Sequence, residues 1–194
     1  MNDAENIYGK AIIFSAPSGA GKTTVVKHII EKIPELSFSI SACSRKKRTN
    51  EINGVDYHFL DLEEFQNKIK ADEFIEWEEV YENKFYGTLK SEINKIWNIN
   101  KHVIFDVDVV GGISLKKYFG GNALSIFIEP PSIEVLENRL KSRNTDSNED
   151  IKTRVNKAIE ELNYKNQFDH CIMNDDLNET LKNADNLIVE FLKK

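Results

Sequence analysis

Short apolar runs predict the strands of this chain. The first run, KAIIFSA, covers residues 10–16, and similar runs follow at 102–110, 123–129 and 170–174. These runs are mostly apolar, which is typical of strands buried on both faces.

Between the runs, apolar residues recur at helical spacing. After the first run they stand at Val25, Val26, Ile29, Ile30 and Ile33, one stripe of an amphipathic helix. Strands that alternate with helices favour a mostly parallel sheet covered on both faces. The predicted fold class is therefore α/β.

Two later helices have N-terminal start signals. Ser147 with Asp150, and Asp176 with Glu179, have the spacing of a capping box, and apolar residues at helical spacing follow each pair. We therefore expect one helix to begin near Ser147 and another near Asp176.

Two stretches interrupt this alternation. Residues 37–88 hold short extended pieces (FSISA, DYHF and EFIEWEEV) around one helix starting near Asp61, which predicts a small, partly antiparallel insertion. Residues 142–150, SRNTDSNED, contain no apolar side chain and are typical of a surface loop. A length of 194 residues suits a single domain that includes these inserted parts.

Composition narrows the function classes. A net charge of −6 argues against a general nucleic-acid binder, and no apolar run is long enough to span a membrane. We see no signal peptide, and Cys43 and Cys171 have neither disulfide nor metal-ligand spacing. The expected location is the cytoplasm, without nucleic-acid or membrane partners.

The stretch FSAPSGAGKTTVV lies between the first predicted strand and the first predicted helix. It matches the phosphate-loop pattern G-x-x-x-x-G-K-[ST] except that alanine stands at the first glycine. Because one methyl group is tolerable where φ is negative, we expect the loop to work. The candidate ATP-binding residues are Ala16, Pro17, Ser18, Gly19, Ala20, Gly21, Lys22, Thr23 and Thr24.

The chemistry of such a loop follows from its residue types. Backbone N–H groups and the helix N-terminus attract phosphate, and Gly19 and Gly21 allow the close approach of the backbone. Lys22 reaches the β- and γ-phosphates, and the hydroxyl of Thr23 can ligate Mg²⁺.

One basic cluster, SRKKR at residues 44–48, stands out in this acidic chain. By itself it fits either a solvated surface loop or an anion site. The pattern FDVD offers a second candidate, since two carboxylates at alternate strand positions, Asp106 and Asp108, point to one side. Burying both would need a metal or a substrate.

Taken together, several blocks resemble the guanylate kinase family. They are SISACSRKKRTNEINGVDYHF, FIEWEEVYENKFYGT, FDVDVVGG, SIFIEPPS, RLKSRNTDS and MNDD, in the family's order from about residue 10 to the C-terminus. The resemblance implies transfer of the γ-phosphate of ATP to GMP, and also to dGMP, with Mg²⁺. It also implies a core (1–36, 89–130 and 151–194), a GMP-binding region (37–88) and a lid (131–150).

The resemblance assigns roles to individual residues. Those matching the family's contacts to the GMP phosphate are Ser41, Arg45, Arg48, Tyr57 and Tyr86. Glu76 would accept from the two adjacent guanine donors, Thr88 would donate to the carbonyl, Asp106 would lie near Mg²⁺, and Asp108 near GMP. Asn174 of MNDD belongs to the ATP side. The arginines expected to clamp the transferring phosphoryl group, together with Lys22 and Arg45, are Arg139, Arg143 and Arg154.

Two positions depart from the family pattern. Val110 stands where the family often has glutamine, and Asn144 replaces the glycine of the R-G-T turn. Asparagine tolerates positive φ better than most residues, so the turn can survive.

Two other functions compete with a monomeric or homodimeric kinase. A non-catalytic guanylate-kinase-like interaction module typically loses phosphate-loop residues, whereas Lys22 and Thr23 are kept. A kinase acting on another phosphorylated substrate is disfavoured by the guanine-reading pair. The four histidines are expected to be structural, and Phe65, Phe74 and Trp77 to lie in the core.

Overall fold

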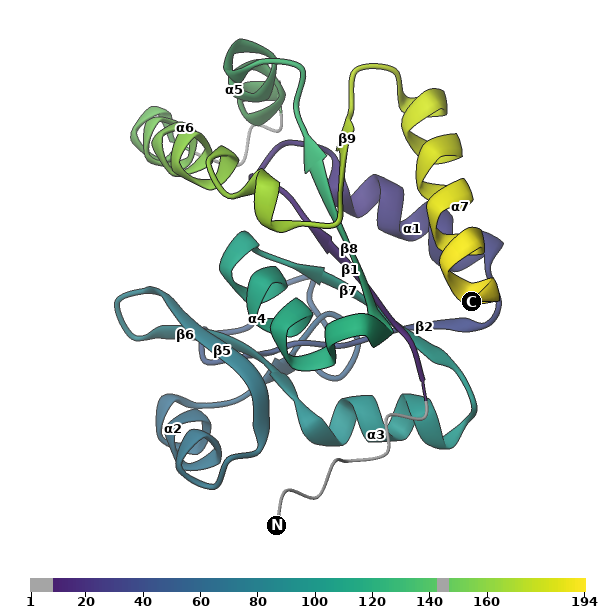
Figure 1. Cartoon of the computed structure of the whole chain (residues 1–194). Helices are drawn as coiled ribbons and strands as arrows, with labels where there is room; N and C mark the ends of the chain where they lie inside the picture. The colour runs from purple at the N-terminus through teal and green to yellow at the C-terminus, as the bar shows by residue number, and fades with distance from the viewer. Residues whose placement is uncertain (1–8, 143–146) are drawn as a thin grey trace.

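The computed structural model describes residues 9–142 and 147–194 (Figure 1). Its core is a five-stranded sheet in which every pairing is parallel, where the sequence predicted a mostly parallel one. In sheet order the strands are β2 (Leu36–Phe38), β7 (His102–Val107), β1 (Ala11–Ser15), β8 (Ala123–Glu129) and β9 (His170–Met173). All five residues of the central strand β1 are buried.

Helices cover both faces of this sheet (Figure 1). On one face, α1 (Lys22–Lys32) and α7 (Leu177–Lys193) pack against Ile12 and Phe14. On the other, α3 (Lys90–Asn98) and α4 (Val109–Phe119) pack against Ala11 and Ile13. This alternation follows from the period of two in a strand, so β1 serves both cores.

Two further helices lie at the end of the sheet that carries the phosphate loop. α5 (Ile133–Ser142) and α6 (Asn148–Leu162) pack on each other through Leu136, Leu140, Ile151 and Ala158. The capping box predicted at Ser147 and Asp150 is present, and Asp176 caps α7 by accepting from the Glu179 backbone N–H. Two 3₁₀ turns, η1 (Gly120–Asn122) and η2 (Lys165–Gln167), precede β8 and β9.

The inserted region forms a second sheet beside the core (Figure 1). Its strands, in order, are β4 (His58–Phe59), β3 (Ala42–Cys43), β6 (Lys84–Leu89) and β5 (Phe74–Tyr81). The sheet is partly antiparallel, and α2 (Leu62–Lys70) begins after Asp61, whose side chain caps it; both features were predicted. Phe65, Phe74 and Phe85 give the region a core of its own.

The structure corrects three expectations. The strand expected at 102–110 ends at Val107, because Asp108 is not a strand residue but the N-cap of α4. Ser37 and Phe38, expected in the insertion, belong to the core sheet as part of β2. Trp77 is 46% exposed instead of buried, because its cross-strand partner is Gly87, which has no side chain to cover the indole.

Most of the histidines make structural contacts, in line with their expected role. His28 contacts Asp185 and His58 contacts Glu92, while His102 Nδ1 accepts from the Lys10 backbone N–H. Among the described residues, no helix combines the length and apolar character needed to cross a membrane.

Candidate active site

The phosphate loop (residues 16–24) connects β1 to α1. Gly19 and Gly21 have φ of +96° and +97°, values that side chains resist, so both glycines are required by the backbone path. Gly21 is also the N-cap of α1 and offers no side-chain acceptor. No capping side chain therefore competes with an anion for the N-terminus of the helix.

Lys22 and Thr23, the first residues of α1, meet the end of β7. The distance from Lys22 Nζ to Asp106 Oδ1 is 2.7 Å, and Thr23 Oγ1 donates to Asp106 Oδ2 at 3.1 Å. Lys22 also donates to the carbonyl of Val107. Because β7 pairs directly with β1, Asp106 lies beside Phe14 and is brought to the loop by sheet register.

Two of the three predicted arginines reach the phosphate loop. Arg139 on α5 donates to the carbonyl of Ala20 at 3.5 Å and to that of Asn174 at 3.1 Å. Arg154 on α6 donates to Ser18 Oγ at 3.0 Å. Arg143 and Asn144 lie outside the described residues.

Asn174 is a buried residue that hydrogen-bonds to the phosphate loop. Its side-chain N–H donates to the Ala20 carbonyl at 2.7 Å, and the residue is only 5% exposed. A Cβ on Gly21 would lie 2.3 Å from that same amide nitrogen. Glycine at 21 is thus needed both for its backbone conformation and for space.

A cavity of about 380 Å³ joins the phosphate loop to the inserted sheet. Most of the residues predicted for the site line it, namely Ala16, Pro17, Ser18, Gly19, Gly21, Lys22, Thr23, Thr24, Ser41, Tyr57, Glu76, Tyr86, Asp106, Asp108 and Arg154. Thr88 is fully buried and contacts the lining residue Glu76, and Arg45 lies over the ring of the lining residue Tyr57. Segments far apart in the chain therefore meet around a single space.

Glu76 and Thr88 face each other across β5 and β6. They are cross-strand partners, and Thr88 Oγ1 donates to Glu76 Oε1 at 2.6 Å. Burial raises the pKa of Glu76 to about 7, although the bond from Thr88 opposes this shift. A Cβ on Gly111 would lie 3.2 Å from Glu76 Oε2 and from Asp108 Oδ1, so a glycine there leaves room for both carboxylates.

Sequence reasoning missed several residues that line the cavity. Burial raises the pKa of Glu78 and of Glu161 to about 7, with a further increase from the nearby Asp108 carboxylate. Lys157 lies with them. Signals were available, because Glu78 is two residues from Glu76 on one strand, and Lys157 and Glu161 follow Arg154 by three and seven residues on one helix.

Two tyrosines line the part of the cavity that the inserted region forms. The rings of Tyr57 and Tyr86 have centroids 6.0 Å apart, and both line the cavity with Ser41. The Arg45 guanidinium carbon lies 5.0 Å from the Tyr57 ring centroid. Arg45 of the basic cluster thus lies over the ring of a cavity-lining residue, whereas residues 46–48 are exposed.

Comparison with known proteins agrees with this geometry. The family model for guanylate kinase matches residues 8–191. The chain is 53% identical to a guanylate kinase of Porphyromonas gingivalis, over 95% of this chain and 99% of that protein. A guanylate kinase of Bacteroides thetaiotaomicron is 50% identical, over 96% and 91%.

A solved structure agrees with these relatives. The crystal structure of guanylate kinase from Anaplasma phagocytophilum superimposes with a TM-score of 0.74 at 27% identity, covering 94% of this chain and 85% of that one. The matches in sequence and in fold extend over the loop, the inserted sheet and the cavity between them. The chain therefore belongs to the guanylate kinase family, the enzymes that transfer the γ-phosphate of ATP to GMP.

Proposed function

We propose that this cavity transfers the γ-phosphate of ATP to GMP in line, with ATP on the phosphate loop and GMP against the inserted sheet. The observation that carries the proposal is the single space lined both by the loop and by Glu76 with Thr88 behind it. Two substrates entering from these two sides would meet near Lys22 and Asp106.

At the ATP end, the backbone N–H groups of residues 18–23 would hold the phosphates. Lys22 is already poised within the cavity and would transfer its contact from Asp106 to the β- and γ-phosphates. Asn174 and Arg139 act on the loop itself, since both contact the Ala20 carbonyl. Arg154, beside Ser18, is placed to neutralise charge on the transferring group.

The residues near Asp106 fit a magnesium ion. Thr23 Oγ1 and Asp106 Oδ2 lie 3.1 Å apart, an all-oxygen pair of the kind that Mg²⁺ prefers when phosphates and water complete its shell. No cluster of three or more His, Cys, Asp or Glu ligands occurs in the described ranges, which fits an ion held mainly by the nucleotide. When bound, the ion would neutralise charge on the phosphates of the nucleotide.

At the GMP end, guanine recognition follows from complementary donors and acceptors. Guanine presents a ring N–H and an amino group side by side, and the Glu76 carboxylate can accept from both. The Thr88 hydroxyl, now donating to Glu76, would turn to donate to the guanine carbonyl. Adenine would leave the buried carboxylate facing a lone pair, which is costly.

The phosphate of GMP would be held by hydroxyls and arginine forks. Ser41, Tyr57 and Tyr86, which line the cavity, would supply the hydroxyls. Arg45, which lies over the Tyr57 ring, and Arg48 would supply the guanidinium groups. Asp108 caps α4, and its carboxylate lies near that of Glu76, so it would also contact GMP. Arg143 keeps its proposed role on the transferring phosphoryl group.

Further features of the protein are proposals of the same kind. We infer acceptance of dGMP, since the assigned contacts are to the base and the phosphate. All assigned residues come from one chain, so a monomer would suffice and a homodimer would hold two such sites. A cytoplasmic enzyme without nucleic-acid or membrane partners fits these two substrates, and residues 131–150 would close over ATP as a lid.

A coupled assay of ADP release tests the proposal. With ATP, turnover is expected with GMP and dGMP and roughly 10⁴-fold less kcat/KM with AMP, and it should stop when EDTA removes Mg²⁺. CMP and UMP serve as further controls. Binding of GMP without turnover would instead favour the non-catalytic interaction module, and equal use of AMP would refute guanine recognition by Glu76.

A further inference from the structure

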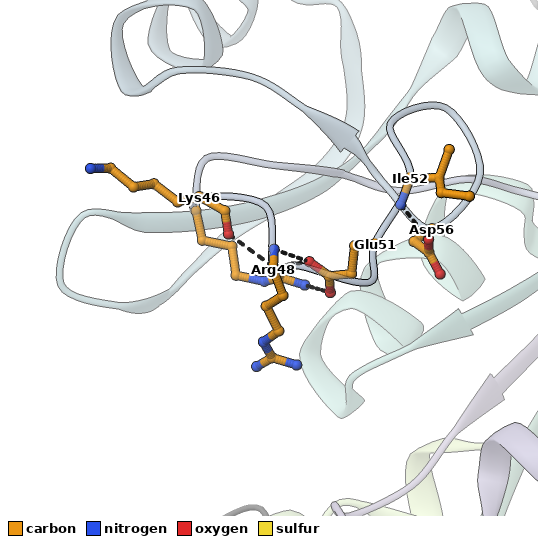
Figure 2. Close-up of polar contacts among 6 residues, drawn as sticks. Lys46, Arg48, Glu51, Ile52 and Asp56 are labelled. Carbon is orange, nitrogen blue, oxygen red and sulfur yellow. Dashed lines mark hydrogen bonds and ion pairs between the residues drawn. The ribbon is translucent and has the colours of Figure 1, made fainter.

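Glu51 holds two parts of the basic cluster at once (Figure 2). Its carboxylate accepts from Nη1 of Arg45 at 2.6 Å and from Nη2 of the same side chain. It also accepts from the backbone N–H of Arg48 at 2.8 Å. The side chains of Arg45 and Glu51 are only 12% and 15% exposed, so water screens this ion pair weakly.

The pair is charged at any physiological pH. The bond from Arg45 holds the pKa of Glu51 at about 2, well below its ordinary value, and the carboxylate in turn raises the pKa of Arg45. A bidentate contact between guanidinium and carboxylate also fixes the plane of the guanidinium. Glu51 therefore acts as a permanent, oriented anion within the loop.

The edge of Arg45 that Glu51 occupies determines what remains for a ligand. Nη1 donates both to Glu51 and to the Lys46 carbonyl at 3.1 Å, while Nη2 uses one N–H for Glu51. An arginine has five N–H donors, so the bonds to Glu51 and Lys46 leave the N–H of Nε and one N–H of Nη2, which lie parallel on the other edge. That edge is a second fork. The hydroxyl of Tyr86 is a further hydrogen-bonding neighbour of this guanidinium.

The faces of the guanidinium are fixed as well. The Arg45 carbon lies 5.0 Å from the ring centroid of Tyr57 and 5.4 Å from that of Phe59. Burial raises the pKa of Tyr86 while the neighbouring Arg45 lowers it, which places guanidinium and phenol together. Because Tyr57 and Tyr86 line the cavity, the second fork of Arg45 adjoins the proposed phosphate site.

We propose that Glu51 is a positioning residue for the GMP phosphate: it stays bound to Arg45 and the Arg48 backbone when GMP binds, and it directs the second fork of Arg45 at the phosphate. This rests on the proposed function. The Arg48 side chain extends away from the Glu51 carboxylate (Figure 2), so Glu51 orders the Arg48 backbone without occupying its guanidinium. The alternative is that Glu51 is an internal substitute for phosphate, which GMP displaces.

Asp56 offers a matched control in the same loop. Its carboxylate accepts from the backbone N–H of Ile52 at 2.7 Å, so it orders the loop as Glu51 does at Arg48 (Figure 2). Its bond is to the backbone of Ile52, not to an arginine side chain. Asp56→Asn therefore removes the charge from this loop contact, as Glu51→Gln does from its own, without disturbing the fork of Arg45.

The experiment measures KM for GMP and for ATP, and kcat, in Glu51→Gln and Asp56→Asn. Glutamine keeps one acceptor but turns an amino group toward an N–H donor, so we expect KM for GMP to rise about tenfold, as for a lost charge-assisted bond. In Glu51→Gln, KM for ATP and kcat should stay within about twofold of wild type. In Asp56→Asn, kcat and both KM values should stay within the same limit. Glu51→Asp keeps the charge but reaches less far, so its KM for GMP should lie between the values of wild type and Glu51→Gln.

A double-mutant cycle separates positioning from loop stability. In an Arg45→Met background, Glu51→Gln should change KM for GMP less than about twofold, because its effect passes through Arg45. The ratio of KM for GMP in Glu51→Gln to that in the wild type should also stay constant from pH 6 to 9. The reason is that the Glu51 carboxylate is ionised throughout this range.

Four results would overturn the proposal. A lower KM for GMP in Glu51→Gln would show that Glu51 competes with phosphate, and an unchanged KM would show that it positions nothing. An equal rise in Asp56→Asn would reduce its role to loop order. If Glu51→Gln does not fold, a wild-type KM for GMP in Glu51→Asp would likewise show that Glu51 positions nothing. Failure of the wild type to phosphorylate GMP would instead reject the proposed function.

Discussion

The two ends of the cavity are built in different ways. The ATP end is one continuous stretch, residues 16–24, shaped by its own backbone and by two glycines with positive φ. The GMP end is assembled from side chains on β5, β6, α4 and the loops before and after β3, brought together only by folding. The ATP end would bind phosphate through main-chain N–H groups, and the GMP end would bind a base through side-chain oxygens.

This difference separates general affinity from specificity. Backbone N–H groups and a helix N-terminus attract any phosphate, so the ATP end needs little side-chain chemistry beyond Lys22 and Thr23. A base must be distinguished from others of similar size, and that requires buried polar groups that a wrong base leaves unpaired. Burial of Glu76 disfavours its charged form in the free protein and raises its pKa to about 7, so this specificity lowers stability.

The largest effect is expected at the ATP end. Lys22→Ala should lower kcat by roughly 10²–10³-fold, because it removes the charge nearest the transferring group. Steady-state turnover measures this, and a circular dichroism spectrum checks the fold. Lys27→Ala, an exposed lysine on the same helix, is the control and should match wild type. Near-normal turnover in a folded Lys22→Ala protein would refute the role of the loop.

The next effect tests the GMP end alone. Glu76→Gln should lower kcat/KM for GMP by roughly 10²-fold, because an amino group would face a guanine donor, while KM for ATP stays unchanged. The same variant should melt at a higher temperature at pH 8, since a buried charge is removed.

Glu79→Gln, on the exposed part of the same strand, is the control for both measurements. Loss of activity equal for GMP and ATP, or a lower melting temperature at pH 8, would contradict the assignment of Glu76.

The pH profile should distinguish the two ends as well. The pKa of Glu76 lies near 7 in the free protein, and guanine needs the ionised form, so affinity is complete above pH 7 and is lost as the pH falls. Between pH 7 and pH 5, kcat/KM for GMP should fall up to tenfold per unit. KM for ATP, at saturating GMP, should not follow this profile, and Glu76→Gln should abolish it. A profile that persists in Glu76→Gln assigns the titration elsewhere.

The smallest effect concerns backbone geometry. Gly21→Ala should cost about 1 kcal/mol of folding free energy from its φ of +97°, and its Cβ should also displace Asn174 and raise KM for ATP several-fold. Gly120→Ala has positive φ but no atom within 4 Å of the new Cβ. It should lose stability, measured by urea unfolding, with an unchanged KM for ATP. Equal KM values in both variants would show that Asn174 does not support the loop.

Several features could be predicted from the sequence because they depend on nearby residues. The phosphate loop, the start of α2 near Asp61 and the capping box at Ser147 each need only a few neighbouring positions, and each lies where it was expected. Apolar runs and helical stripes likewise predicted the α/β layers. Hydrogen bonds within one turn and a regular period are properties that a short segment already possesses.

Tertiary structure alone decided how distant residues combine. Asp108 became a helix cap and not a second strand carboxylate, and Trp77 stayed exposed because Gly87 lies opposite it. Glu78 and Glu161 joined the cavity wall from a strand and a helix far apart in the chain. Burial sets the pKa of such carboxyl groups, and burial depends on which elements pack together. The sequence by itself therefore determined the residue types and the local backbone of the site, and long-range packing determined their neighbours and charge states.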